Sequence, residues 1–97
     1  MQNAEIIFRD KYVFADGAIR EMIIWRLPTA DVVRPHGLKY SLYYGFPGTR
    51  LVGYDNELGK GDHRHYGDRE EPYNFSTVEQ LVADFEKDID SLRSLKP

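Results

Sequence analysis

Two histidines placed two positions apart are the residues of this sequence best suited to chemistry. His63 and His65 flank Arg64 within a short segment that is dense in charged side chains. In an extended chain, residues two apart point to the same side, so both imidazoles would face one small volume while Arg64 points elsewhere. Imidazole titrates near neutral pH, so such a pair can supply a general base and a general acid.

Cleavage of RNA by its own 2′-hydroxyl needs such an acid–base pair. It also needs a cation that stabilises the charge developing on the phosphorane. Lys60, Arg64 and Arg69 are the candidates for that cation. We therefore predict a catalytic set that consists of His63, His65, Lys60 and Arg64.

Aromatic and polar side chains around the histidines could contact a substrate. Tyrosines can stack on bases, as aromatic platforms do for single strands, although packing beneath the segment is an equally good interpretation of each ring. The predicted substrate-binding residues are Tyr54, Asn56, Tyr66, Arg69 and Tyr73.

Other uses of the histidine pair remain open. A His-x-His pair can chelate a metal if Asp62, Asp68 or a glutamate completes the ligand set. The segment could also be a contact surface of a non-catalytic module that binds nucleic acid or protein. In the plainest alternative, the histidines of a surface loop bond to neighbouring carboxylates. The acid–base hypothesis requires no metal and no cofactor.

Length and composition restrict the kind of protein that carries this segment. A chain of 97 residues predicts a single domain, residues 1–97. The absence of cysteine excludes a disulfide framework, a thiolate metal site and a cysteine nucleophile. No apolar run approaches the roughly 20 residues of a membrane span, and the N-terminus lacks the pattern of a signal peptide. We expect a cytoplasmic protein with no membrane partner.

The net charge of −3 argues against a protein that coats nucleic acid with a broad basic surface. The charge is unevenly distributed, however. Residues 1–59 carry seven basic and seven acidic side chains, whereas residues 76–97 carry three basic and five acidic ones. The acidic excess therefore belongs mostly to the C-terminal segment, and an RNA substrate remains compatible with a local contact.

Four strands are predicted in the first half of the chain, over residues 4–15, 18–27, 38–46 and 50–54. Asp16-Gly17 predicts a hairpin with a type I′ turn, which needs positive φ at two positions. Pro47-Gly48 predicts a type II turn between the third and fourth strands. In the second strand, one parity holds Ile19, Ile23, Trp25 and Leu27, and we expect that face, including Trp25, in the core.

The remaining segments predict a loop and a helix. Residues 28–37 lack periodicity, and residues 55–75 predict a long, ordered functional loop. Ser76 and Glu79 have the pattern of a capping box, and an apolar stripe from Val78 to Leu92 predicts an amphipathic helix over residues 77–94. The expected fold class is α+β: a four-stranded antiparallel meander of two hairpins, a long loop, and one C-terminal helix packed on a sheet face.

The central motifs resemble those of the TumE family, small toxin components of bacterial and archaeal toxin–antitoxin pairs. They are Val-Gly-Tyr-Asp-Asn-Glu at 52–57, Gly-Lys-Gly-Asp-His-Arg-His at 59–65, and Glu-Glu-Pro-Tyr-Asn-Phe at 70–75. The resemblance implies growth inhibition, a helix-turn-helix antitoxin as partner, and RNA as a substrate of a ribonuclease-type activity. The matching positions are Tyr54, Asp55, Asn56, Lys60, Gly61, Asp62, His63, Arg64 and His65. Exposed strand edges also allow a homodimer.

Overall fold

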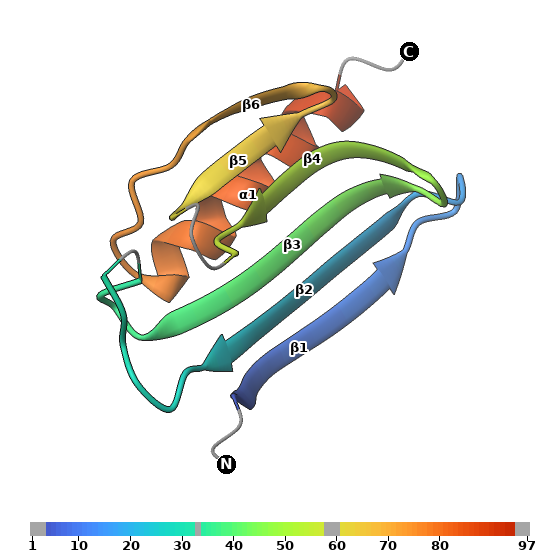
Figure 1. The fold of residues 1–97 in the computed structure, drawn as a ribbon. Helices are drawn as coiled ribbons and strands as arrows, with labels where there is room; N and C mark the ends of the chain where they lie inside the picture. The colour runs from blue at the N-terminus through green and yellow to red at the C-terminus, as the bar shows by residue number, and fades with distance from the viewer. Residues whose placement is uncertain (1–3, 33, 58–60, 95–97) are drawn as a thin grey trace.

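The computed structural model describes residues 4–32, 34–57 and 61–94. It is an α+β fold in which six antiparallel strands lie in chain order and one helix covers part of a single face (Figure 1). The strands are β1 (Glu5–Val13), β2 (Ile19–Arg26), β3 (Leu38–Phe46), β4 (Thr49–Asp55), β5 (His63–Tyr66) and β6 (Arg69–Pro72). The helix is α1 (Val78–Ser94).

The sheet has six strands, so the prediction of four strands followed by a long loop was wrong. The segment assigned to that loop contains β5 and β6, two strands of four residues each. They form a hairpin whose turn contains Gly67, at φ +60°, and β5 pairs with β4. Backbone hydrogen bonds to β4 define these strands, and their polar sequence has no apolar alternation that could reveal them.

The first hairpin is confirmed, but its predicted turn type was wrong. Among the described residues, only glycines have positive φ, so Asp16 does not adopt the conformation that a type I′ turn requires. The Phe14 N–H donates to the Ala18 carbonyl at 2.8 Å, and Gly17 has φ +90°. A three-residue loop with glycine in the left-handed region therefore closes the hairpin. The Asp16 carboxylate accepts from the Ala18 N–H at 3.0 Å.

The core lies between the sheet and α1. The β2 residues that it contains alternate with those that were predicted to be buried. Met22 and Ile24 are buried, whereas Ile23 and Trp25 lie on the opposite face and remain partly exposed. Both parities of this strand carry large apolar side chains, so alternation alone could not identify the face that the helix covers. The buried hydrophobic residues are Ala18, Met22, Ile24, Tyr40, Leu42, Tyr44, Val52, Tyr54, Tyr73, Leu81, Phe85 and Ile89.

The C-terminal helix is confirmed, with a different cap. Leu81, Phe85 and Ile89 of α1 are buried against the sheet, as the apolar stripe predicted. The Gln80 N–H donates to the Thr77 side-chain oxygen at 3.0 Å, so Thr77 caps the helix in place of the predicted Ser76. No helix among the described residues is long and apolar enough to cross a membrane.

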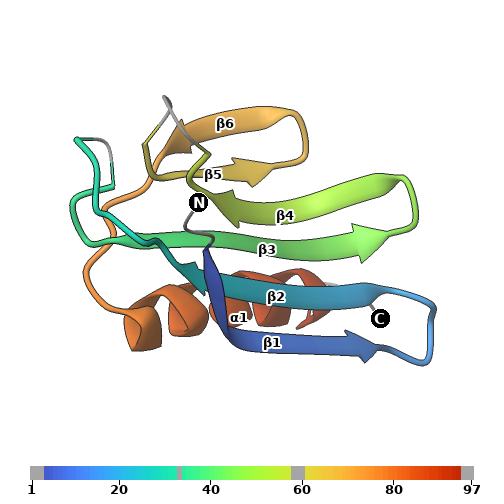
Figure 2. The same ribbon diagram turned by 60° about the horizontal axis from the view of Figure 1, so that its bottom comes forward.

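Among the described residues, a helix covers only one face of the sheet. The helix lies on the far side of the sheet in Figure 1, and the view turned by 60° also shows it on one side alone (Figure 2). We call the side that contacts α1 the helix face and the other side the open face. Because directly paired residues of an antiparallel sheet point to the same side, the strand register assigns each side chain to one of these faces.

Candidate functional site

The strand register gathers four side chains on the open face. Asp55 of β4 pairs with His63 of β5, and His65 pairs with Glu70 of β6. His63 and His65 are two residues apart, so all four side chains point away from the helix. We call Asp55, His63, His65 and Glu70 the histidine site.

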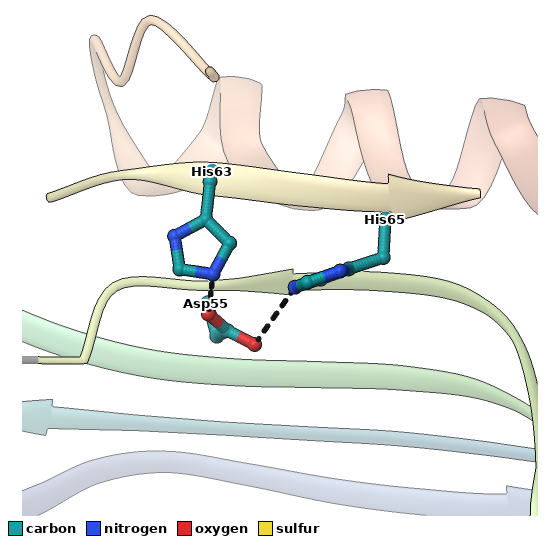
Figure 3. Close-up of side chains that lie close together, drawn as sticks. All are labelled: Asp55, His63 and His65. Carbon is teal, nitrogen blue, oxygen red and sulfur yellow. Dashed lines mark ion pairs between the residues drawn. The ribbon is translucent and has the colours of Figure 1, made fainter. Parts of the chain in front are cut away.

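The Asp55 carboxylate lies between the two imidazoles. Its Oδ1 is 2.5 Å from Nε2 of His63, and its Oδ2 is 3.5 Å from Nε2 of His65. Figure 3 shows both rings pointing from β5 toward this carboxylate on the neighbouring strand. The ring centroids are 4.9 Å apart and the ring planes are nearly perpendicular, at 79°. Each histidine therefore presents its Nε2 to a shared acceptor.

A second carboxylate closes the site from the edge strand. Oε2 of Glu70 lies 3.3 Å from Nε2 of His63 and 3.4 Å from Nε2 of His65. The Glu70 side chain is 47% exposed, whereas those of His63 and His65 are 8% and 12% exposed. Glu70 is thus the member of the site that is most open to solvent. Beside it, His63 and Glu70 line a pocket of about 290 Å³.

The contacts of His63 distinguish its two ring nitrogens. Nδ1 lies 3.1 Å from the carbonyl oxygen of Gly61, while Nε2 faces the Asp55 carboxylate. A carbonyl oxygen can only accept a hydrogen bond, so the Gly61 contact is satisfied when Nδ1 carries a proton. Oδ1 of Asp55, although close to Nε2, is buried and makes no hydrogen bond among the described residues. Nε2, which faces the carboxylate on the open face, is therefore the ring nitrogen of His63 that is placed to exchange a proton.

His65 has a different environment. Burial lowers the pKa of His65, and the positive charge of Arg50 lowers it further, while the Asp55 carboxylate acts in the opposite direction. The lowered pKa favours a neutral imidazole, which can accept a proton. Within this pair, His65 is therefore the histidine whose surroundings suit the role of base.

Glycine at position 53 allows Arg50 to approach this site. Gly53 pairs with His65 across the β4–β5 ladder, so a side chain at position 53 would point to the open face. A Cβ atom there would lie 2.7 Å from Cδ of Arg50, closer than side-chain contacts allow. The Arg50 side chain therefore lies across the glycine, on the same face as His65.

The same cluster has the composition of a metal site. Asp55, His63 and His65 each offer one ligand atom, and these three atoms lie within 4.8 Å of one another. Histidine and carboxylate ligands suit zinc and other divalent transition metals. The Gly61 carbonyl that accepts from Nδ1 of His63 is the kind of partner that orients a metal-bound imidazole.

A buried polar network fixes the backbone on both sides of the site. Asn56 is fully buried: its side-chain oxygen accepts from the Tyr40 N–H at 3.0 Å, and its amide donates to the Leu38 carbonyl at 2.8 Å. The amide also donates to Asp62 at 3.1 Å, and the Tyr40 hydroxyl donates to the same carboxylate at 2.8 Å. Asn56 follows Asp55 and Asp62 precedes His63, so the network holds these two neighbours in register.

His36, in the 28–37 segment that lacks periodicity, also belongs to this network. Its Nδ1 accepts from the Leu38 N–H at 3.2 Å, so its Nε2 carries the proton and donates to Asp62, also at 3.2 Å. The His36 ring also packs against Phe75, with the ring centroids 4.2 Å apart. His36 therefore supports Asp62 and does not join the other two histidines.

Arg64, Arg69 and the three predicted substrate-binding tyrosines lie apart from the histidine site, on the helix face. Arg64 points to the helix face, where its Nε donates to Glu71 at 2.7 Å. Tyr54 and Tyr66 both donate their hydroxyls to Asp88 of the helix, and burial raises the pKa of both phenols.

Tyr73 and Arg69 are also held on that side. Tyr73 is buried and donates its hydroxyl to Asp84 of the helix at 2.6 Å. Arg69 lies over the Tyr66 ring, 5.2 Å from its centroid. Lys60 lies outside the described residues. The packed tyrosines, together with buried Asn56, thus have structural partners within the fold.

Two members of the site were absent from the predicted catalytic set. Asp55 appeared only as part of the motif that ends β4, and Glu70 only as a possible metal ligand among other glutamates. The pairing of Asp55 with His63 and of Glu70 with His65 depends on the β5–β6 hairpin. A Gly-Asp pair at positions 67–68 is a hairpin signal that could have indicated it.

With the geometry established, comparison with known proteins gives the class of this chain. The model of the family described as toxin TumE matches residues 2–93. The chain therefore belongs to the TumE toxin family. Membership supports a toxin role, and a toxin family implies an antitoxin as partner. Comparison with the curated proteins and with the solved structures finds no match.

Proposed function

We propose that this toxin is a cytoplasmic endoribonuclease that needs no metal, and that a helix-turn-helix antitoxin neutralises it. The observation that carries the proposal is the Asp55 carboxylate held between the Nε2 atoms of His63 and His65. Two histidines held at one carboxylate can form the acid–base pair that RNA cleavage requires, with His65 as the base because its pKa is lowered.

In the proposed reaction, neutral His65 removes the proton from a 2′-hydroxyl of the RNA. The 2′-oxygen then forms a bond to the adjacent phosphorus, and the bond from phosphorus to the 5′-oxygen breaks. His63 gives its proton to the leaving 5′-oxygen. The products are a 2′,3′-cyclic phosphate and a free 5′-hydroxyl, so atoms and protons balance. Asp55 orients both rings and stabilises the charge on His63.

The phosphorane in this reaction requires a nearby cation. Arg50 lies on the open face and its charge acts on His65, so it is the described cation best placed for this role. Lys60 stays a prediction for the same role. Arg64 is occupied by Glu71 on the other side of the sheet. The contact between His65 and Asp55, at 3.5 Å, is long enough to be exchanged for a substrate hydroxyl.

Replacement of the two histidines tests this proposal. The double variant His63→Ala/His65→Ala should lose RNA cleavage and toxicity while its circular dichroism spectrum stays unchanged. Because His63 is buried, His63→Asn/His65→Asn provides a second version that keeps polar groups in place. Full toxicity in either folded variant would overturn the acid–base role. The cleavage rate of the wild type should also follow a bell-shaped pH profile, which a module that only binds would not show.

A metal centre is the second candidate, because two of the distances in the histidine site fit one. Two ligands of a tetrahedral zinc ion lie about 3.3 Å apart, and the contacts of Glu70 with both histidines measure 3.3 and 3.4 Å. The 2.5 Å contact between His63 and Asp55 is shorter than this spacing, and Oδ1 of Asp55 is buried without a hydrogen-bond partner among the described residues. Elemental analysis of protein purified without a nickel column decides between the two: a stoichiometric metal that is needed for cleavage would replace the metal-free mechanism.

A further inference from the structure

The cations of this protein divide into two groups. Eleven basic side chains lie among the described residues. Six of them form ion pairs: Arg20, Arg26, Arg34, Arg64, Arg69 and Arg93. The other five make no ion pair within the described ranges: Arg9, Lys11, Lys39, Arg50 and Lys87. A cation without a carboxylate partner is free to bind an anion.

Four of these five unpaired cations lie on the open face. Across the strands, Arg9 pairs with Ile23 of β2, and Ile23 pairs with Ser41 of β3. Ser41 in turn pairs with Asp55 of the histidine site. Arg9 therefore belongs to the same row of side chains as Asp55 and His63. At about 4.8 Å per strand, the row from β1 to β5 spans about 19 Å.

A parallel row leads from Lys11 to His65. Lys11 pairs with Glu21, Glu21 with Tyr43, Tyr43 with Gly53, and Gly53 with His65. Arg50 lies across Gly53 at the end of this row and, with Tyr43, lines a pocket of about 490 Å³. Within β1, β2 and β3, these two rows contain a single acidic residue, Glu21.

An aromatic ring lies beside the same path. Trp25 of β2 pairs with Lys39 of β3, and the ammonium of Lys39 lies 5.0 Å from the centroid of the Trp25 ring. Trp25 and Tyr43 are partly exposed on the open face. A sheet surface with partly exposed aromatic rings and unpaired cations suits single-stranded nucleic acid, because bases stack on the rings while the cations contact phosphates.

We propose that the open face of β1, β2 and β3 binds single-stranded RNA and leads it to the histidine site. Arg9, Lys11, Lys39 and Arg50 contact the phosphates, and Trp25 stacks on a base. This proposal rests on the proposed ribonuclease function for its substrate. It assigns RNA binding to residues other than the tyrosines packed against the helix, and it explains how an acidic protein can hold an anionic substrate: the acids of the helix are on the other side.

Binding of an uncleavable RNA tests the path separately from catalysis. The probe is a fluorescein-labelled 12-nucleotide RNA with 2′-O-methyl groups, which cannot undergo attack by its own 2′-oxygen. Fluorescence anisotropy over a series of salt concentrations gives the affinity and its salt dependence for the purified full chain. Lys11→Gln, Lys39→Gln and Arg50→Gln should each weaken binding about fivefold near 0.1 M salt and reduce the salt slope by about 0.7. Trp25→Leu should weaken binding about tenfold with an unchanged slope.

Lys87 provides a matched control, because it is an exposed and unpaired lysine of the helix, on the other side of the sheet. Lys87→Gln removes the same charge and should leave both affinity and slope unchanged. Equal effects of Lys87→Gln and Lys11→Gln would overturn the path, since only net charge would then matter. No binding of the probe by the wild type would overturn it as well.

The two proposals fail in different ways. The variant His63→Asn/His65→Asn should bind the probe as tightly as the wild type even though it cleaves nothing. If the wild type binds the probe through Lys11, Lys39 and Trp25 but never cleaves RNA, the path is supported and the ribonuclease function fails. If RNA is cleaved with the rate unaffected by Lys11→Gln, Lys39→Gln and Trp25→Leu, and these variants bind normally, the path fails and the ribonuclease function remains.

Discussion

The two faces of the sheet carry similar kinds of residues and use them differently. On the helix face, Arg64 pairs with Glu71, Arg20 pairs with Asp10, and the hydroxyl of Tyr54 donates to Asp88. On the open face, Arg9 and Lys11 make no ion pair within the described residues. The polar groups named on the helix face thus pair with one another, either between strands or across the interface with α1. On the open face, the histidine site pairs internally, whereas Arg9 and Lys11 are left for an external partner.

The comparison also explains the acidity of the chain. The helix carries much of the acidic excess, and two of its acids have structural roles. Asp84 accepts from Tyr73, and Asp88 accepts from Tyr54 and Tyr66. These acids fix the helix to the sheet on the side away from the histidine site. Net charge therefore says little about the surface that a substrate would meet.

The largest expected effect comes from replacing Asp55, the carboxylate of the open face that contacts both histidines. Asp55→Asn removes the charge that orients both histidines, so RNA cleavage should fall about 100-fold. The fold should survive, because the amide can still occupy the same space. Cleavage rates and thermal unfolding curves measure the two quantities. A variant that cleaves at the wild-type rate would show that Asp55 does not serve catalysis.

Asn56 tests the buried network that holds the site. Asn56→Ala leaves the buried N–H of Tyr40 without its acceptor, which is 3.0 Å away in the native fold. The free energy of unfolding should fall by about 2–3 kcal/mol, measured by urea denaturation. Cleavage should fall as well, since Asn56 fixes the residue next to Asp55. Unchanged stability would contradict the structural role of Asn56.

Asp88 is the counterpart of Asp55 on the helix face. Asp88→Ala removes the acceptor of two tyrosine hydroxyls, so the free energy of unfolding should fall by about 1–2 kcal/mol. Cleavage by the folded fraction should remain at the wild-type rate. Tyr66→Phe, which removes one of the two donors, should have a smaller effect. Loss of cleavage by folded Asp88→Ala protein would break the division of roles between the faces.

The smallest expected effect is a dependence of stability on pH. The pKa of His65 is lowered in the folded protein by burial and by Arg50. The stability that neutral His65 contributes is therefore present above its unfolded pKa of about 6.5 and is lost as the pH falls below it. The wild type should lose more free energy of unfolding between about pH 7 and pH 5 than His65→Gln does. Equal losses in urea titrations at the two pH values would show that His65 is not the group responsible.

Local patterns in the sequence were enough to predict several elements. Strict alternation gave β3 with its observed bounds, and the apolar stripe gave α1 to within one residue at its start. The turns of the first two hairpins were placed correctly because glycine marks the positions of positive φ, at Gly17 and Gly48. In each case the signal depends on neighbours within a few residues of one another.

Other features could not be read in this way. The polar strands β5 and β6 are defined by pairing with β4, and Trp25 was assigned to the core because both parities of β2 are apolar. Either Ser76 or Thr77 could cap α1 on sequence grounds. The observed start of the helix at Val78 makes Thr77 the cap.

The sequence by itself determined the fold class, the family motifs and the presence of two histidines at a spacing that places them on one side of a strand. Tertiary structure alone decided that Asp55 and Glu70 would join them and that Arg64 and the tyrosines would turn toward the helix. It also decided which unpaired cations share the open face. The physical reason is that strand register and helix placement bring together residues far apart in the chain, and no local pattern encodes those distances.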